Sequence, residues 1–175
     1  MQNRFVKLLI PFCCVLVFAI SSIAQTKCDL VNSPKLLNLN LGMASTDVKL
    51  LFGKDLNVKV KNKGEQTFFQ NYIEKPAQNR LVGIRALYLR FFDDKLYQIE
   101  IFYENSSDSL TLLDFTKAIS VEMNFAEDTW QIKHNKALIS CGEFSLFADN
   151  ILNPRIELTD ETTLVKVKSL RKDKK

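Results

Sequence analysis

The fold is decided by residues 84–104, IRALYLRFFDDKLYQIEIFYE. Two long runs of aromatic and branched residues flank Asp93-Asp94-Lys95, a stretch typical of a tight turn. In the second run, apolar residues such as Ile99 and Ile101 alternate with polar ones such as Glu100, as in a strand with one buried face and one wet face. The segment therefore predicts a long β-hairpin.

A second hairpin is predicted upstream. Apolar and polar residues alternate in residues 56–60, and the aromatic-rich segment 68–73 follows the turn signal at residues 62–64. Residues 74–80 contain a proline and predict a loop.

The residues before this hairpin predict a strand followed by a short helix. Leucines at alternate positions of residues 37–41 predict the strand, which ends at Gly42. Ser45 or Thr46 is suited to cap the helix, and Gly53 can adopt the left-handed conformation at its end.

Downstream of the central hairpin the pattern alternates between helix and strand. Apolar residues recur at helical spacing over residues 112–123, which predicts a longer helix. Residues 138–148 predict a strand long enough to cross the sheet, and residues 156–158 a shorter one. Residues 160–168 are compatible with either a strand or a helix. Valines alternate with lysines as in a strand, whereas the acidic pair before them can start a helix.

Together these segments predict a single α+β domain. We expect an antiparallel sheet of about five to seven strands, with one long and one short helix packed on one face. Thirteen phenylalanines against five glycines and four prolines favour a packed body over a disordered chain.

The first residues have the pattern of an export signal. Arg4 and Lys7 give a positive start, residues 8–20 are apolar, and small residues precede Gln25. A retained membrane anchor is the alternative, but the apolar run is short for a spanning helix and contains Pro11.

We therefore expect cleavage after Ala24. The predicted organisation is a signal peptide at residues 1–24, one α+β domain at residues 25–165 and a basic tail at residues 166–175. The mature protein is expected to be secreted or periplasmic.

Two cysteines, Cys28 and Cys141, remain after cleavage. An even pair in an exported domain predicts a disulfide bond. The alternatives are a lipid-modified Cys28 and a reactive thiol. Residues 25–27 lack the apolar and small residues expected before a lipidation cysteine.

The positive charge is concentrated at the C-terminus. The whole chain carries a formal net charge of +4, whereas the mature chain is mildly acidic outside its tail. The tail makes an anionic surface a possible contact, through Lys166, Lys168, Arg171 and Lys172. A solvated tail is the alternative, and an exported protein is not expected to bind nucleic acid.

The sequence offers little catalytic chemistry. His134 is the single histidine, which excludes a multi-histidine zinc site and makes it the one base available to a Ser-His-acid triad. Its polar surroundings are typical of an exposed histidine. The paired carboxylates, Asp93-Asp94 and Glu127-Asp128, fit solvated turns. We therefore expect no enzyme activity, no cofactor and no metal site.

Four aromatic residues are candidates for contact with a partner. Phe68, Phe92 and Phe102 would form an apolar patch if they clustered on the uncovered sheet face. Trp130 is suited to stack on a ligand, and a buried position in the core is the alternative.

One segment resembles a known family. Leu39-Asn40-Leu41-Gly42-Met43, followed by Val48-Lys49 and Phe52-Gly53, resembles the opening of the small outer-membrane-assembly lipoproteins of the SmpA/OmlA type and of β-lactamase-inhibitor-like exported domains. The resemblance implies short helices against a small antiparallel sheet and a role in binding other proteins. The lipidation cysteine of the first group is not evident in this chain.

The sequence thus leaves three hypotheses. The first is a non-enzymatic interaction module that binds another envelope or secreted protein through its open sheet face or a strand edge. The second is a small extracytoplasmic hydrolase built on His134 or a carboxylate pair. The third is a protein that binds the envelope surface through its basic tail.

Overall fold

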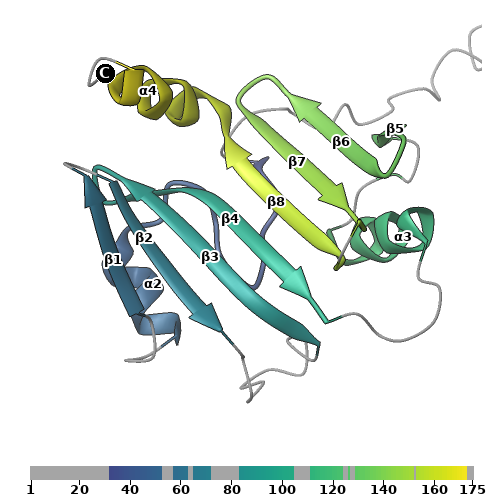
Figure 1. Ribbon diagram of the computed structural model, residues 1–175, viewed down its shortest axis with the longest axis horizontal. Coiled ribbons are helices and arrows are strands. Elements are labelled where there is room, and N and C mark those ends of the chain that lie inside the picture. Colours follow the sequence, from purple (N-terminus) through teal and green to yellow (C-terminus); the bar gives the residue numbers. More distant parts are fainter. Residues whose placement is uncertain are drawn as a thin grey trace, which may run out of the picture.

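The computed structural model describes residues 32–52, 57–62, 65–71, 83–104, 111–123, 126, 129–151 and 153–172. Its main element is an eight-stranded antiparallel sheet with the strand order β1-β2-β3-β4-β8-β7-β6-β5 (Figure 1). The strands are β1 (Asn57–Asn62), β2 (Glu65–Asn71), β3 (Ile84–Phe92), β4 (Lys95–Tyr103), β5 (Gln131–Lys133), β6 (Lys136–Cys141), β7 (Phe144–Asp149) and β8 (Arg155–Asp160). The predicted α+β class and antiparallel sheet are confirmed.

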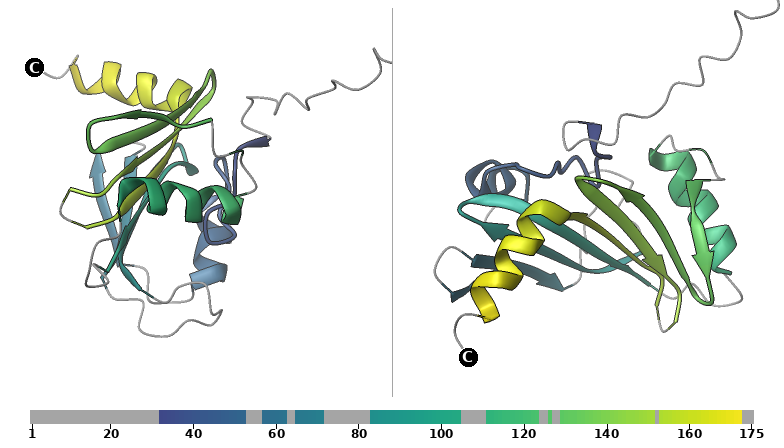
Figure 2. Two further views of the ribbon diagram at one scale, coloured as in Figure 1. Left: turned by 90° about the vertical axis from the view of Figure 1, so that its right-hand side faces the viewer. Right: turned by 90° about the horizontal axis from the view of Figure 1, so that it is seen from above.

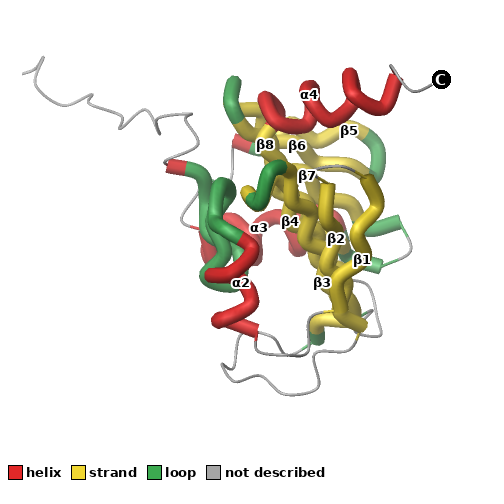
Figure 3. Tube along the Cα trace, turned by 90° about the vertical axis from the view of Figure 1, so that its left-hand side faces the viewer, coloured by secondary structure: helices red, strands yellow, loops and turns green. Residues whose placement is uncertain are grey.

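The described residues include three helices beside the sheet: α2 (Ser45–Phe52), α3 (Leu112–Met123) and α4 (Glu161–Lys172). The short α2 and the longer α3 lie on one face, as predicted, together with residues 32–44 (Figures 2 and 3). Helix α4 leaves β8 at one end of the sheet and extends toward the opposite side. No described helix combines the length and the apolar character that crossing a bilayer requires.

The element order repeats along the chain. Helix α2 precedes the four antiparallel strands β1–β4, and α3 precedes the four antiparallel strands β5–β8. The last strands of the two sets, β4 and β8, pair with each other and join the halves into one sheet. The sequence shows no such repeat, so the two halves have the same order of elements without detectable similarity in amino-acid sequence.

The predicted central hairpin is confirmed as β3 and β4. Asp93 and Asp94 have φ angles of 48° and 63°, the left-handed pair that a type I′ turn requires. Gly42 also has a positive φ, and its N–H donates to the carbonyl oxygen of Leu96 at 2.7 Å. The chain before α2 is therefore fixed against the start of β4.

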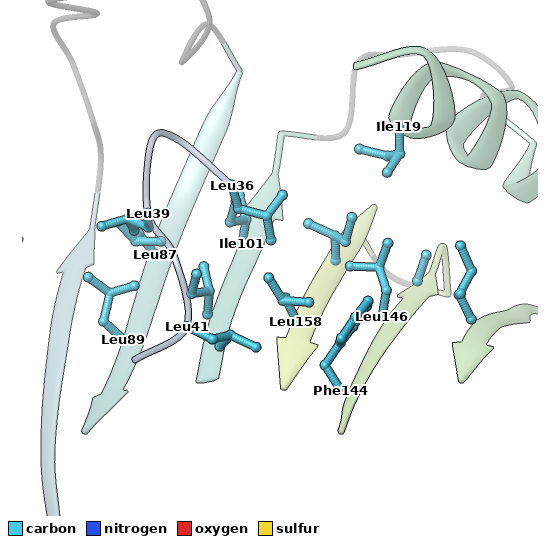
Figure 4. Close-up of a cluster of buried hydrophobic side chains, with 14 of the residues drawn as sticks. Leu36, Leu39, Leu41, Leu87, Leu89, Ile101, Ile119, Phe144, Leu146 and Leu158 are labelled. Carbon is cyan, nitrogen blue, oxygen red and sulfur yellow. The ribbon is translucent and has the colours of Figure 1, made fainter. Parts of the chain in front are cut away.

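The hydrophobic core lies between the sheet and the layer of α2, α3 and residues 32–44 (Figure 4). One register row crosses both halves and is almost completely buried: Leu89, Ile99, Leu158, Leu146 and Ile139. Each fully buried side chain of this size stabilises the fold by about 1.5–3 kcal/mol.

The strand predicted over residues 138–148 is interrupted, which raises the strand number above the expected five to seven. The chain turns at Gly142 and Glu143, so that β6 and β7 pair with each other. Buried Cys141 and Phe144 flank this turn and continue the apolar pattern through it. The short β5 is the other added strand.

The strand predicted over residues 37–41 is wrong. Leu37 and Asn38 have φ angles of 56° and 65° and form a tight turn, across which Leu36 and Leu39 exchange two backbone hydrogen bonds. Leu36, Leu39 and Leu41 are all buried in the core. Burial of these leucines outweighs the left-handed backbone at Leu37.

The C-terminal segment, for which the sequence allowed either a strand or a helix, forms the helix α4. Asp160 accepts hydrogen bonds from the Thr163 N–H at 2.9 Å and the Thr163 hydroxyl at 2.6 Å, as an N-cap residue does. The side chain of Val167 is buried. Residues 166–172 of the predicted tail therefore belong to a helix that starts within the domain.

The structure also tests the predicted first hairpin and the predicted start of the short helix. The hairpin of β1 and β2 is confirmed. The predicted cap at Ser45 or Thr46 is wrong, since α2 already begins at Ser45 and includes Thr46. The Ser45 hydroxyl donates instead to the carboxylate of Asp94. The predicted loop at residues 74–80 lies outside the described residues, as does the leader.

Candidate functional site

Strands β4 and β8 lie side by side within the sheet (Figure 1). The sheet surface away from α2 and α3 carries a connected set of polar and aromatic side chains around this pairing. These residues alternate with core residues along their strands, and we call their surface the seam face. It consists of Tyr88, Arg90, Gln98, Glu100, Phe102, Ser145, Phe147, Asp149, Arg155, Glu157 and Thr159. At its middle, Glu100 lies directly opposite Glu157.

Arg155 is the most heavily contacted residue of the seam face. Its Nη1 donates to Glu100 Oε1 at 2.9 Å, and its Nε and Nη2 donate to Asp149 Oδ2 at 3.0 and 2.5 Å. The guanidinium carbon lies 5.1 Å from the ring centre of Phe147 and 5.8 Å from that of Phe102. Two carboxylates and two rings therefore hold one cation in place.

The electrostatics of Arg155 follow from this environment. Burial lowers the pKa of its guanidinium, but hydrogen bonds and charge from Asp149, and then from Glu100, outweigh burial and raise the pKa above its ordinary value. Arg155 therefore stays positively charged at every pH at which the protein is folded.

Gln98 links the two strands at the other side of Glu100. Its amide oxygen accepts a hydrogen bond from Arg90, whose guanidinium also lies 3.5 Å from Glu100 Oε2. The Gln98 amide nitrogen donates to Glu157 Oε1 at 2.6 Å and to the Thr159 hydroxyl at 3.0 Å. Gln98 and Thr159 are buried, so this amide is fixed in orientation.

The two opposed glutamates are treated differently. Like charges directly opposite each other destabilise a strand pair. Glu100 is compensated by ion pairs with Arg90 and Arg155. Glu157 makes no ion pair with a described residue and is held by hydrogen bonds from Gln98 and Thr159.

Of the three predicted phenylalanines, Phe92 and Phe102 do not lie together, and the side chain of Phe68 lies outside the described part of the structure. Phe102 lies on the seam face, where its ring meets that of Tyr88 edge-on with centroids 5.6 Å apart. Phe92 is partly buried at the far end of the β3–β4 hairpin, about six residues and roughly 20 Å along the strand. Phe68 is in register with the core residue Leu89, whereas Phe102 is in register with Arg155.

Trp130 occupies the core position that the sequence left as its alternative. It is 8% exposed and belongs to the buried cluster. Its indole N–H donates to the Ser120 hydroxyl on α3 at 2.8 Å, which satisfies its polar atom. The ring therefore fixes α3 against the sheet.

Among the described residues considered for hydrolysis, His134 and the Asp93-Asp94 pair lie in different turns. His134 is exposed at the β5–β6 turn and makes no hydrogen bond or ion pair with a described residue. Asp93 and Asp94 are exposed turn residues, and Glu127-Asp128 lies outside the described residues. In the part of the chain that is described, no three metal-binding side chains gather.

The remaining predicted residues are placed as follows. Cys141 is buried at the end of β6, and its predicted partner Cys28 lies outside the described residues. The four predicted anion-contacting residues are all exposed on α4: Lys166, Lys168, Arg171 and Lys172.

The sequence also allowed a partner to bind at a strand edge, but both edge strands have features that disfavour such pairing. β1 contains Lys59 and Lys61, and β5 has three residues and ends in Lys133. Lysines and short length are the devices by which exposed edges resist pairing with another chain. These devices act at strand edges, whereas the seam face is a face of the sheet, so they do not restrict binding to it.

The sequence prediction missed most of the seam face. Arg155, Glu157 and Thr159 alternate along β8 as Gln98, Glu100 and Phe102 do along β4. This shared alternation was the available signal. It places the polar residues of each strand on one face but does not show that the two strands pair.

The chain matches no family model, no curated protein and no solved structure. The resemblance of residues 39–53 to SmpA/OmlA-type and β-lactamase-inhibitor-like domains therefore stays a prediction.

Proposed function

We propose that the protein is an exported, non-enzymatic interaction module that binds another envelope or secreted protein through its seam face. The observation that carries the proposal is the arrangement around Arg155, in which Phe102, Phe147, Glu100 and Asp149 hold the guanidinium on the sheet face that α2 and α3 do not cover.

Two properties of this surface suit a protein partner. Arginine, tyrosine and phenylalanine are enriched at protein interfaces and supply much of their binding energy. The hydrogen bonds of Arg155 and Gln98 fix their side chains before a partner arrives, which reduces the conformational entropy lost on binding. The side chains stand on strands rather than loops.

The test is affinity capture of the partner from the protein's own envelope or culture fluid, with wild type and Phe147→Ala compared. Phe147 is partly buried beside Arg155, and its truncation removes one aromatic wall of the site. We expect the variant to lose the partner while its far-ultraviolet circular dichroism is unchanged. Leu113→Ala on α3 is the matched control, since Leu113 is apolar and 52% exposed on the helix-covered side. Equal loss in both variants, or in neither, would contradict the proposal.

The proposal includes export and a Cys28–Cys141 disulfide bond. Burial of Cys141 at a strand end suits a structural bridge rather than a reactive thiol. N-terminal sequencing of the exported protein is expected to begin at Gln25. Intact mass with and without reductant, after thiol alkylation, is expected to report one bridge. An intact N-terminus on a cytosolic product with both thiols alkylated would overturn this part.

A second candidate is binding of an anionic envelope surface through α4. The observation in its favour is that four cationic side chains are exposed on this one helix. Each cation near an anionic membrane contributes about 1 kcal/mol. Replacement of Lys166, Lys168 and Lys172 by Gln is expected to reduce retention on anionic vesicles. Unchanged retention at low salt would remove this candidate.

A further inference from the structure

The carboxylates of the seam face differ in their partners. Its charged residues are Arg90, Arg155, Glu100, Asp149 and Glu157, and Lys136 on β6 lies in register with Asp149 on the same side of the sheet. The ion pairs join both arginines to Glu100 and Arg155 to Asp149. Glu157 has no cationic partner among the described residues. The surface thus presents, at its centre, one carboxylate that makes no ion pair with a described residue.

The two oxygens of the Glu157 carboxylate differ. Oε1 accepts hydrogen bonds from the Gln98 amide at 2.6 Å and from the Thr159 hydroxyl at 3.1 Å. Oε2 accepts none from a described residue, and it is not among the buried atoms that lack a partner. The carboxylate is therefore held in place at one oxygen and open to solvent at the other.

The surroundings of Glu157 suit a long cationic side chain. Phe147 lies directly opposite Glu157 on β7, and Glu100 with Tyr88 beyond it continues the same row on the other side. Arg155 already packs against the Phe147 ring, so aliphatic and guanidinium groups fit this surface. A partly buried carboxylate with one free oxygen is stabilised most by a cation that also covers the neighbouring apolar surface.

We propose that Glu157 is the contact for a lysine or arginine side chain of the partner protein, which donates to Oε2 while its aliphatic part covers Phe147. The inference rests on the proposed function and specifies the chemistry of the partner. Because Oε1 is occupied, the contact is a single charge-assisted hydrogen bond rather than a bidentate pair. Binding then gives Glu157 the kind of ion-pair partner that Glu100 and Asp149 already have.

The probe is a random peptide library displayed on phage and selected on the immobilised mature protein. Ligands that bind wild type but not Phe147→Ala map to the seam face. We expect their sequences to be enriched in lysine or arginine over the unselected library. Selection on Glu157→Gln is expected to lose that enrichment, because the amide keeps the hydrogen bonds at Oε1 but removes the charge.

A double-mutant cycle then tests the contact itself. For the tightest selected peptide, replacing its basic residue by citrulline or changing Glu157 to Gln is expected to weaken binding at least about tenfold. The two changes together are expected to weaken it no more than either alone, since both remove one interaction. Glu122→Gln is the matched control, because Glu122 is an exposed carboxylate on α3.

The outcomes separate the inference from the proposed function. Two outcomes would overturn the role of Glu157 and leave the binding face intact. The first is a set of seam-face ligands without enrichment in lysine or arginine. The second is a double-mutant cycle in which the loss of affinity from citrulline and the loss from Glu157→Gln multiply independently. If no selected ligand is sensitive to Phe147→Ala, the binding face itself is overturned, and the inference with it.

Discussion

The two halves of the molecule follow one backbone plan but hold their helices in different ways. Helix α2 is tied to a distant part of the sheet, since the Ser45 N–H and hydroxyl both donate to Asp94 in the β3–β4 turn. Helix α3 is fixed locally by Thr111 and Asp114, and by Trp130 against Ser120. The same arrangement of elements is therefore reached through different side-chain chemistry.

The halves also contribute different chemistry to the seam face. β4 supplies the amide of Gln98 and the carboxylate of Glu100, and β8 supplies Arg155, Glu157 and Thr159. Each half already holds one ion pair of its own, Arg90 with Glu100 and Arg155 with Asp149. The pairing of β4 with β8 adds the ion pair of Arg155 with Glu100 and the hydrogen bonds of Gln98 to Glu157 and Thr159. The junction therefore connects two polar clusters into one surface.

The largest expected effect tests whether the halves unfold together. Leu89 and Leu146 are completely buried in the same register row, one in each half. Truncation of either to Ala is expected to cost about 3 kcal/mol. Trp130, the single tryptophan, reports on the second half. If the domain is one cooperative unit, Leu89→Ala shifts the urea transitions of fluorescence and circular dichroism equally. A Trp130 transition unmoved by Leu89→Ala would show two independent halves.

The next effect compares the two arginines of the junction. Arg155→Gln leaves buried Glu100 and Asp149 short of a partner and is expected to destabilise the protein by about 2 kcal/mol. Arg90 is more exposed and its ion pair is longer, so Arg90→Gln is expected to cost less than about 1 kcal/mol. Urea unfolding of both variants measures the difference. Equal losses would mean that Arg155 does not join the halves.

A smaller effect separates the two ways of holding a helix. Thr111→Ala removes the N-cap of α3, and Ser45→Ala removes the tie between α2 and Asp94, each at about 1 kcal/mol. Amide hydrogen exchange is expected to rise in the first turn of α3 alone for Thr111→Ala. For Ser45→Ala it is expected to rise in both α2 and residues 93–96. Exchange confined to α2 would contradict the distant tie.

The smallest effect is the pH dependence of the α3 cap. Hydrogen bonds from the Thr111 hydroxyl and N–H hold the pKa of Asp114 below its usual value. A lowered folded-state pKa stabilises the protein above the unfolded-state pKa, and this contribution is lost as pH falls through the folded-state pKa. Melting temperatures of Asp114→Asn are therefore expected to fall less than those of wild type on acidification. Parallel curves would show that the cap does not titrate.

Local patterns predicted the parts of the fold whose residues satisfy one another nearby. The central hairpin was predictable because alternation and the Asp93-Asp94 turn agree. The turn at Gly142 was not, since buried Cys141 and Phe144 continue the apolar pattern across it. The β-branched residues of α4 equally suit a strand, and the cap at Asp160 decided for the helix.

The candidate site was not predictable for a topological reason. Arg155 forms hydrogen bonds with Asp149, which is six residues away in the sequence, and with Glu100, which is 55 residues away. The contact with Glu100 depends on the pairing of β4 with β8, which no local sequence pattern specifies. The phenylalanine cluster depends on register, which places Phe68 opposite Leu89 and Phe102 opposite Arg155, and which leaves Phe92 six positions from Phe102 along the β3–β4 pairing.

Site-specific photo-crosslinking tests the binding role of the seam face most directly. A benzophenone side chain is placed at position 147, on the seam face, or at position 121, where Val121 is 78% exposed on α3. Irradiation in the native envelope or culture fluid is predicted to give a defined protein adduct from position 147 and none from position 121. An adduct from position 121 alone would contradict the account, because it would place the partner on the helix-covered side.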